Sequence, residues 1–198
     1  MDEESPLPLG YASPPWPRPF RPLALAGIAA TVILAGMLVG ASTNAINGAV
    51  SPTYFESVMG WQILSNVWWE SIAQGVFEGM IGGVLLSIVY TTTLGIITRG
   101  SCTYDMGVRW LGLILLPVYG LWGIGGIAGV VLAALRPQFF QSTFIGVPGE
   151  PGQMLRYAWV GGSIWGAYVG GPLAVIVGLV LFRVNWRRML KQQSGHDS

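Results

Sequence analysis

Four long stretches of the chain are apolar, and shorter polar segments separate them. They cover about residues 23–46, 71–98, 108–135 and 157–186. Each exceeds the ~20 residues that a helix needs to cross a bilayer. A soluble domain of this size would need polar faces on its helices, and these stretches have almost none. The pattern predicts an all-α membrane protein whose transmembrane domain, residues 23–186, contains four spanning helices.

Small residues recur at every fourth position in three of these stretches. The rows are Gly36, Gly40, Asn44 and Gly48 in the first, Ser71, Gly75, Gly79, Gly83, Ser87, Thr91 and Gly95 in the second, and Ala158, Gly162, Gly166, Gly170, Ala174 and Gly178 in the fourth. Small residues at this spacing share one helix face and let a neighbouring backbone approach closely inside lipid. The rows predict close helix packing at Gly75, Gly79, Gly83, Gly162, Gly166 and Gly170.

The segment that follows the first stretch predicts a short helix lying on the outer membrane surface. Ser51 suits the N-cap position of a helix, and Pro52 suits its first turn. The segment is rich in aromatic residues, namely Tyr54, Phe55, Trp61, Trp68 and Trp69. Because Trp and Tyr settle at the level of the lipid headgroups, anchoring is the favoured role. A stacking surface for a ligand or a lipid is the alternative.

Two similarities within the chain predict a tandem repeat of a two-helix unit. Residues 52–57, Pro-Thr-Tyr-Phe-Glu-Ser, resemble residues 137–142, Pro-Gln-Phe-Phe-Gln-Ser, at a shift of 85. The small-residue rows of the second and fourth stretches superpose at a shift of 87. Both copies would begin on the same side, so the repeat would be parallel, about an axis along the membrane normal. Chance alignment is the alternative, because glycine is abundant here.

Charge is scarce and unevenly placed, and this predicts the orientation. Only 10% of the residues are charged and 52% are hydrophobic, against roughly a quarter charged in soluble domains. With four spans, one side carries Arg18, Arg21, Arg99, Arg109, Arg183, Arg187, Arg188 and Lys191, and the other carries Arg136 and Arg156. Basic residues favour the cytoplasmic side. We therefore expect a multi-pass protein of the cell (inner or plasma) membrane with both termini in the cytoplasm.

The two ends of the chain are predicted to be cytoplasmic tails. Residues 1–22 contain seven of the thirteen prolines and should be extended or disordered, because proline opposes both helix and sheet. Residues 187–198 form the second, polar tail. The net charge of +1 and the absence of a basic patch outside the helix flanks give no reason to expect nucleic acid as a partner.

Glu78 is the one charged residue inside the second apolar stretch. An ionised carboxylate costs several kcal/mol in hydrocarbon, so it usually faces a cavity, a partner or a proton path. Gln74 lies one turn away on the same face, and Tyr90, Tyr119 and Tyr168 are further candidate hydrogen-bond partners. One hypothesis is a proton or cation site formed by Glu78 and Gln74. The alternative is a structural role, in which Glu78 joins helices or subunits by hydrogen bonds.

Residues for catalysis or metal binding are few. The only histidine is His196 in the C-terminal tail, the only cysteine is Cys102, and Asp occurs only at positions 2, 105 and 197. Neither a Ser–His pair nor an aspartyl dyad can therefore form inside the membrane. One Cys and one His make no metal or haem site of recognisable spacing. We expect no enzymatic activity, no cofactor and no metal.

The preferred hypothesis is a structural or accessory subunit, or a homo-oligomer, that assembles in the lipid bilayer through its Gly-rich helices. A small channel or secondary transporter, with Glu78 as its proton or cation site, is the alternative. A third and weaker hypothesis, lipid handling, rests only on the aromatic residues of the outer segment. The sequence identifies neither a substrate nor a partner.

Overall fold

The computed structural model describes residues 20–194, with side chains through Lys191. Within this range the chain forms six helices and no strand. The long helices are α1 (Pro22–Val50), α3 (Val67–Thr98), α4 (Tyr104–Leu135) and α6 (Pro151–Ser194), and the short ones are α2 (Pro52–Met59) and α5 (Pro137–Thr143). All four long helices are long and apolar enough to cross a membrane. This confirms the predicted all-α membrane fold with four spans.

The helices are longer than the apolar stretches that predicted them. The largest difference is in α6, which continues from the predicted end at Trp186 to Ser194, so most of the predicted C-terminal tail is helical. The added residues include Arg, Lys and Gln, which are good helix formers. Cations also interact favourably with the C-terminal end of a helix, where Lys191 lies. Residues 1–19 of the predicted Pro-rich tail lie outside the described residues.

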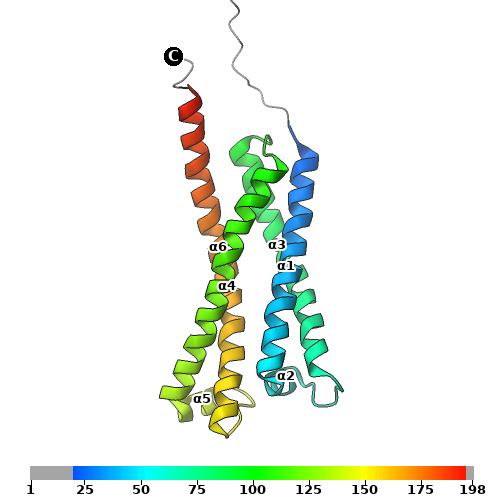
Figure 1. Cartoon of the computed structure of the whole chain (residues 1–198), viewed down its shortest axis with the longest axis vertical. Coiled ribbons are helices and arrows are strands. Elements are labelled where there is room, and N and C mark those ends of the chain that lie inside the picture. The colour runs from blue at the N-terminus through cyan, green and yellow to red at the C-terminus, as the bar shows by residue number, and fades with distance from the viewer. Residues whose placement is uncertain (1–19, 195–198) are drawn as a thin grey trace, which may run out of the picture.

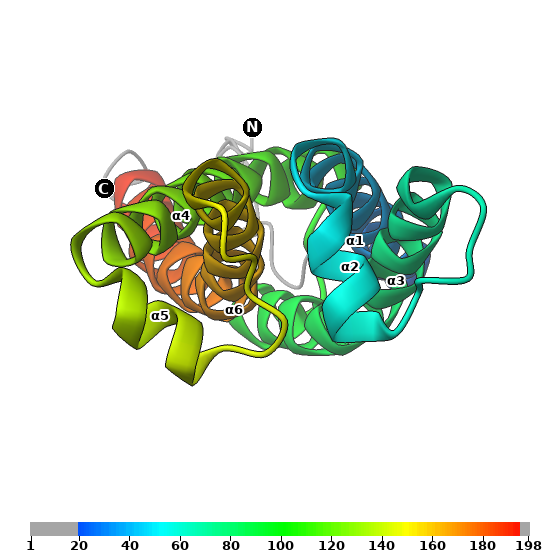
Figure 2. The same ribbon diagram turned by 90° about the horizontal axis from the view of Figure 1, so that it is seen from below.

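The long helices form two antiparallel pairs, as Figure 1 shows in side view. Helix α1 packs along α3, and α4 packs along α6, whereas contacts between the two pairs are much sparser. Figure 2, seen from below, shows α1 and α3 on one side and α4 and α6 on the other. The short helices α2 and α5 both lie at the lower end in Figure 1, which we call the α2/α5 end.

The opposite end carries most of the basic residues, and we call it the Arg-rich end. It holds the start of α1, the loop from α3 to α4 and the end of α6 (Figure 1). The basic residues in or near these segments are Arg21, Arg99, Arg109, Arg183, Arg187, Arg188 and Lys191. Arg18 lies outside the described residues. Which side of a membrane the Arg-rich end faces stays a prediction.

Small residues line the contact within each pair. A Cβ atom added to Gly40 would overlap the carbonyl oxygen of Gly75, and one added to Gly36 would overlap that of Gly79. In the second pair, a Cβ atom at Gly162 would overlap the carbonyl oxygen of Gly125. Each of the six predicted packing glycines faces the other helix of its own pair. The glycine rows therefore pack against helices of the same chain, and they give no argument for an interface with another subunit.

The described residues form two clusters of buried hydrophobic side chains. The larger one draws on all four long helices and includes Ile28, Leu94, Ile114 and Phe182. It occupies the half of the molecule nearer the Arg-rich end, where the two pairs meet. The smaller cluster lies under α5 and is centred on Phe140, Tyr157 and Ala158.

Helix α2 forms where the sequence predicts a short helix, with Pro52 in its first turn. Ser51 occupies the N-cap position, but its side chain makes no capping hydrogen bond. Phe55 is fully buried and stacks on Trp61, with 5.7 Å between ring centroids, so this predicted interfacial residue packs inside the protein. Trp68 and Trp69 remain exposed, which agrees with a place at the membrane surface.

Candidate intramembrane binding site

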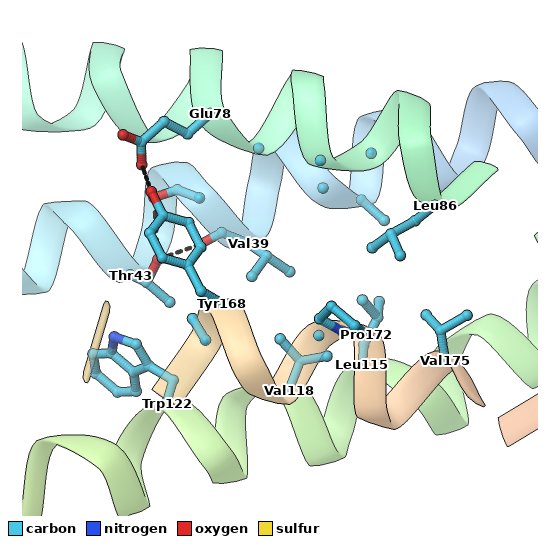
Figure 3. Close-up of a pocket in the computed structure, with 18 of the residues that line it drawn as sticks. Val39, Thr43, Glu78, Leu86, Leu115, Val118, Trp122, Tyr168, Pro172 and Val175 are labelled. Atoms are coloured by element: carbon cyan, nitrogen blue, oxygen red, sulfur yellow. Dashed lines mark hydrogen bonds between the residues drawn. The ribbon is translucent and has the colours of Figure 1, made fainter. Parts of the chain in front are cut away.

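A cavity of about 380 Å³ lies between the two helix pairs, and all four long helices line it (Figure 3). Its volume falls within the range of ~300–1,000 Å³ that is usual for small-molecule sites. Most lining residues are aliphatic or glycine. Glu78 is the only lining residue with an ionisable acid or base group other than a phenol, among the part of the chain that the structure describes.

The cavity has a polar end and an apolar end. On α1 the lining residues run from Val32 toward the α2/α5 end, where they become Thr43, Asn44 and Asn47. The same change occurs on the other three helices, where Glu78, Trp122 and Tyr168 lie nearer the α2/α5 end than Leu86, Leu111 and Val175, respectively. Figure 3 shows Thr43, Glu78, Trp122 and Tyr168 gathered at one end of the cavity. Tyr90 lies at the apolar end.

Glu78 joins the two helix pairs at the polar end. Its Oε1 accepts a hydrogen bond from Gln74 Nε2 at 2.6 Å, and its Oε2 accepts one from the Tyr168 hydroxyl at 2.8 Å. Gln74 lies on α3 with Glu78, whereas Tyr168 reaches across from α6 (Figure 3). Two of the four candidate partners are therefore in place. The Glu78 side chain thus accepts one hydrogen bond from its own helix pair and one from the other pair.

The other two candidate partners are engaged elsewhere. Tyr90 donates to the backbone carbonyl of Gly107 at 2.8 Å, and Tyr119 shares a hydrogen bond of 2.8 Å with Ser42. Both of these bonds also join the first helix pair to the second. The hydroxyl of Tyr90 is thus satisfied although it lies at the apolar end of the cavity.

Two unpaired hydrogen-bond donors line the same cavity. Asn47 is completely buried, and its Oδ1 accepts from Ser163 Oγ at 3.0 Å. Its Nδ2 and the Nε1 of Trp122 are buried without a hydrogen-bond partner among residues 20–194. A third such donor, Trp159 Nε1, does not line the cavity. Leaving a buried donor unpaired costs about 1–3 kcal/mol, so each of these groups is a place where a ligand atom would be stabilised.

Sequence reasoning missed Asn47, Ser163 and Trp122. The first span was predicted to end at about residue 46, just before Asn47, whereas α1 continues to Val50. A signal existed, because an amide three residues after Asn44 in an apolar run is costly inside a membrane and therefore informative. Trp122 carries no such signal, because the largely apolar tryptophan side chain does not stand out within an apolar stretch.

The electrostatic influence of Glu78 reaches the outer segment. Burial raises the pKa of the Tyr54 phenol above its usual value, and the negative charge of Glu78 adds to this shift. Tyr54, on α2, also packs against Tyr157 of α6, with 5.0 Å between ring centroids. Helix α2 therefore lies near the polar end of the cavity. Tyr54, predicted as an interfacial aromatic, belongs to the surroundings of Glu78.

Other groups in the described part of the chain suggest no second centre. No three His, Cys, Asp or Glu side chains come together there as metal ligands. Cys102 is buried, and burial raises the pKa of its thiol, which disfavours the reactive thiolate. Asp105 and Arg109 form an exposed ion pair of 3.0 Å on the first turns of α4.

Comparisons with known protein families, with curated proteins and with solved structures find no match. Function must therefore be argued from the cavity itself. Its geometry offers a mostly apolar space between two helix pairs, one carboxyl group bonded to both pairs, and two buried donors without an acceptor among the described residues.

Proposed function

We propose that this protein is a small secondary transporter in which the cavity holds the substrate and Glu78 takes up and releases a proton. The observation that carries the proposal is the pair of hydrogen bonds from Gln74 and Tyr168 to the two oxygens of Glu78. Through these bonds one carboxyl group is connected to both helix pairs. The cavity between the pairs supplies the place for a substrate.

Protonation of Glu78 would change how the two pairs hold each other. A carboxylate accepts hydrogen bonds at both oxygens, whereas a carboxylic acid must use one oxygen as a donor. A proton on Oε2 would compete with the bond that Tyr168 donates from α6. Because contacts between the pairs are sparse, a changed bond here favours the rocking of one pair against the other that moves many transporters.

We also infer that the two helix pairs are copies of one unit. Close contacts recur at the shifts seen in the sequence: Gly40 with Gly75 corresponds to Gly125 with Gly162. Both units have the order long helix, short helix, long helix. Duplicated halves around a central site are a frequent plan among transporters, which supports the transport hypothesis over a purely structural role.

Proteoliposomes with an entrapped pH-sensitive dye test the transport hypothesis. A proton gradient is imposed with and without added organic solutes, and the rate of internal pH change is compared for wild type and Glu78→Gln. We expect a Glu78-dependent proton flux that at least one solute accelerates, and its loss in Glu78→Gln. Glu70→Gln is the matched control, because Glu70 is exposed at the start of α3 and lies away from the cavity. Equal rates for wild type and Glu78→Gln under every condition would refute the proposal.

A subunit of a larger assembly is the second candidate. The glycines that first suggested it pack within the chain, but Gly112 and Gly120 of α4 face outward with open space around them. Small outward residues let another helix approach closely in lipid. The mass and composition of the protein in mild detergent test this candidate. A stoichiometric complex that Gly112→Leu or Gly120→Leu disrupts would support it, whereas a monomer would count against it.

A further inference from the structure

We propose that the cavity accepts a single-chain amphiphile with a neutral head group that both donates and accepts hydrogen bonds, such as a hydroxyl or an amide. The head would lie at the polar end and the tail along the apolar end. This inference rests on the proposed transport function, because it names the substrate class of the same site. It follows from three features of the cavity: its unpaired donors, its single carboxyl group and its graded polarity.

The head group must accept hydrogen bonds. Asn47 Nδ2 and Trp122 Nε1 are donors that find no acceptor within the described residues, and both residues line the polar end. Asn47 is completely buried, so its side chain forms no hydrogen bond with bulk water. A ligand oxygen at the polar end, met by a small shift of either side chain, would give such a donor an acceptor and recover the free energy that an unpaired buried donor costs.

The head group must also donate. Each oxygen of Glu78 already accepts one hydrogen bond, but a carboxylate has about four lone-pair sites and can accept more. A hydroxyl or an amide NH of the ligand would use this remaining capacity. A head group that is donor and acceptor at once therefore matches the hydrogen-bonding chemistry of these three side chains.

A charged head group matches the site less well. No Lys, Arg or His side chain lines the cavity, within the part of the chain that is described, so an anionic head would meet Glu78 without a compensating cation. A cationic head would pair with Glu78 but would leave the Asn47 and Trp122 donors facing a positive charge. Unpaired charge and unpaired polar groups are both costly in a low-dielectric interior.

The tail fits the rest of the cavity. Its lining on α1 runs from Val32 to Asn47, fifteen helical steps that correspond to ~22 Å along the helix. Away from the polar end the walls are mostly Val, Leu, Ile, Ala and Gly, together with Tyr90 and Pro172, and Gly82 and Gly171 leave open space where side chains would project. A space that is long for its volume suits an extended chain better than a bulky ring system. Residues of the larger hydrophobic cluster, among them Leu111 and Val175, line the apolar end.

Glycines supply variants that fill the cavity without disturbing helix packing. A Cβ atom added to Gly82 or Gly171 meets no atom within 4 Å, so leucine at either position would project into the cavity. Gly123 of α4 is the matched control, because it has equally open space and does not line the cavity. Elution of each variant as a single species in size-exclusion chromatography verifies that it folds.

The test is binding of radiolabelled 1-dodecanol to the full chain in lipid nanodiscs. We expect saturable binding that falls at least tenfold in Gly82→Leu and Gly171→Leu and stays unchanged in Gly123→Leu. Trp122→Phe, which removes the N–H donor and keeps a smaller aromatic ring, should weaken binding several-fold. Dodecanoate and dodecylammonium should bind at least tenfold more weakly than the alcohol. Equal dodecanol uptake by the Gly82→Leu, Gly171→Leu and Gly123→Leu proteins would reveal simple partition into lipid and overturn the inference, as would tight binding of either charged chain.

The two proposals fail separately. Saturable, cavity-dependent dodecanol binding without any Glu78-dependent proton flux would refute transport and leave the ligand class standing. A Glu78-dependent flux without dodecanol binding would refute the ligand class and leave transport standing.

Discussion

The first helix pair, α1 with α3, and the second, α4 with α6, meet through small residues at corresponding positions. Gly40 touches Gly75 in the first pair, and Gly125 touches Gly162 in the second, at shifts of 85 and 87 residues. The short helices correspond as well: Phe55 of α2 is 0% exposed and Phe140 of α5 is 5% exposed. At the glycines the facing backbones leave no space for a side chain, and the two phenylalanine rings are buried.

The residues around the cavity differ between the pairs. At the same shifts, Glu78 corresponds to Trp165, which is 66% exposed, and Asn47 corresponds to Leu132. The first pair thus supplies the carboxyl group and one of the unpaired donors, while the second pair supplies Tyr168, Ser163 and Trp122. Contacts that hold each pair together are alike in both, whereas the groups that give the cavity its chemistry are divided between them. The packing within each pair and the polar groups of the cavity therefore depend on different residues.

The largest predicted effect concerns the shared packing. Gly40→Leu and Gly125→Leu each place a side chain against the backbone of the facing helix. Each should lower the free energy of unfolding by about 3 kcal/mol or more, at the upper limit for overpacked interiors. Unfolding in a detergent titration, followed by circular dichroism, measures the effect. If the pairs are equivalent, the two losses should be similar.

Gly123→Leu is the control for this experiment, because its added side chain meets open space. Its stability should stay close to that of wild type. A large loss of unfolding free energy for Gly40→Leu with none for Gly125→Leu would show that only the first pair depends on close helix contact. The two pairs would then not be equivalent.

The next effect concerns the short helices. Phe55→Ala and Phe140→Ala each remove a buried ring, and Phe55→Ala also removes the ring that stacks on Trp61. Losses of about 3 kcal/mol are expected from the cavities left behind. Phe139→Ala, which truncates an exposed neighbour on α5, should cost little. If Phe139→Ala and Phe140→Ala were equally destabilising, burial would not explain the role of α5.

A smaller effect separates two of the tyrosines whose hydroxyls join the helix pairs, Tyr168 and Tyr119. Tyr168→Phe removes the donor to Glu78, and Tyr119→Phe removes the bond to Ser42. Each change should cost only about 0.6 kcal/mol, the average for hydrogen bonds between membrane helices. The proton flux in proteoliposomes should change in Tyr168→Phe alone, because only that hydroxyl touches Glu78. Equal changes in flux for both variants would indicate a general loosening of the pairs.

Much of this architecture could be predicted from the sequence, because it depends on local patterns. Long apolar runs require helices in lipid, where every backbone polar group must be bonded internally. Glu78 was identifiable for the same reason, since one charge in an apolar helix needs a partner, and two of its four candidate partners do bond to it. Helix α6 continues past the predicted end of its span, because charged residues after Trp186 continue a helix as readily as they end a span.

The cavity could not be predicted, because it depends on how one helix pair sits against the other. Small residues indicate close approach, but they do not say which helix approaches, and the rows that suggested assembly with a partner pack within the chain. The missing hydrogen bonds of Asn47 and Trp122 depend on the positions of single atoms across that interface. Only the spacing of Asn47 from Asn44 offered a sequence signal.

The smallest predicted effect concerns the start of the second long helix in each pair. Helix α3 is capped by the neutral side chain of Asn66, which accepts from the Trp69 amide at 3.3 Å. At the start of α6, Glu150 accepts from the amides of Gly152 and Gln153, both at 2.8 Å, and these bonds lower the pKa of its carboxyl below the ordinary value of 4.5. Because this pKa is lower in the folded than in the unfolded chain, the cap stabilises above the unfolded value and is lost as the pH falls through the folded value.

Amide hydrogen exchange in detergent micelles measures this difference at the two helix starts. Between pH 6 and pH 3, after correction for intrinsic rates, protection of the Gly152 and Gln153 amides should fall while that of the Trp69 amide persists. Glu150→Gln should remove the pH dependence, since an amide side chain does not titrate. Unchanged protection at Gly152 and Gln153 would show that water replaces the cap without cost. Because Glu150 is fully exposed, the expected change is confined to the first turn of α6, and neither helix packing nor the cavity should respond to it.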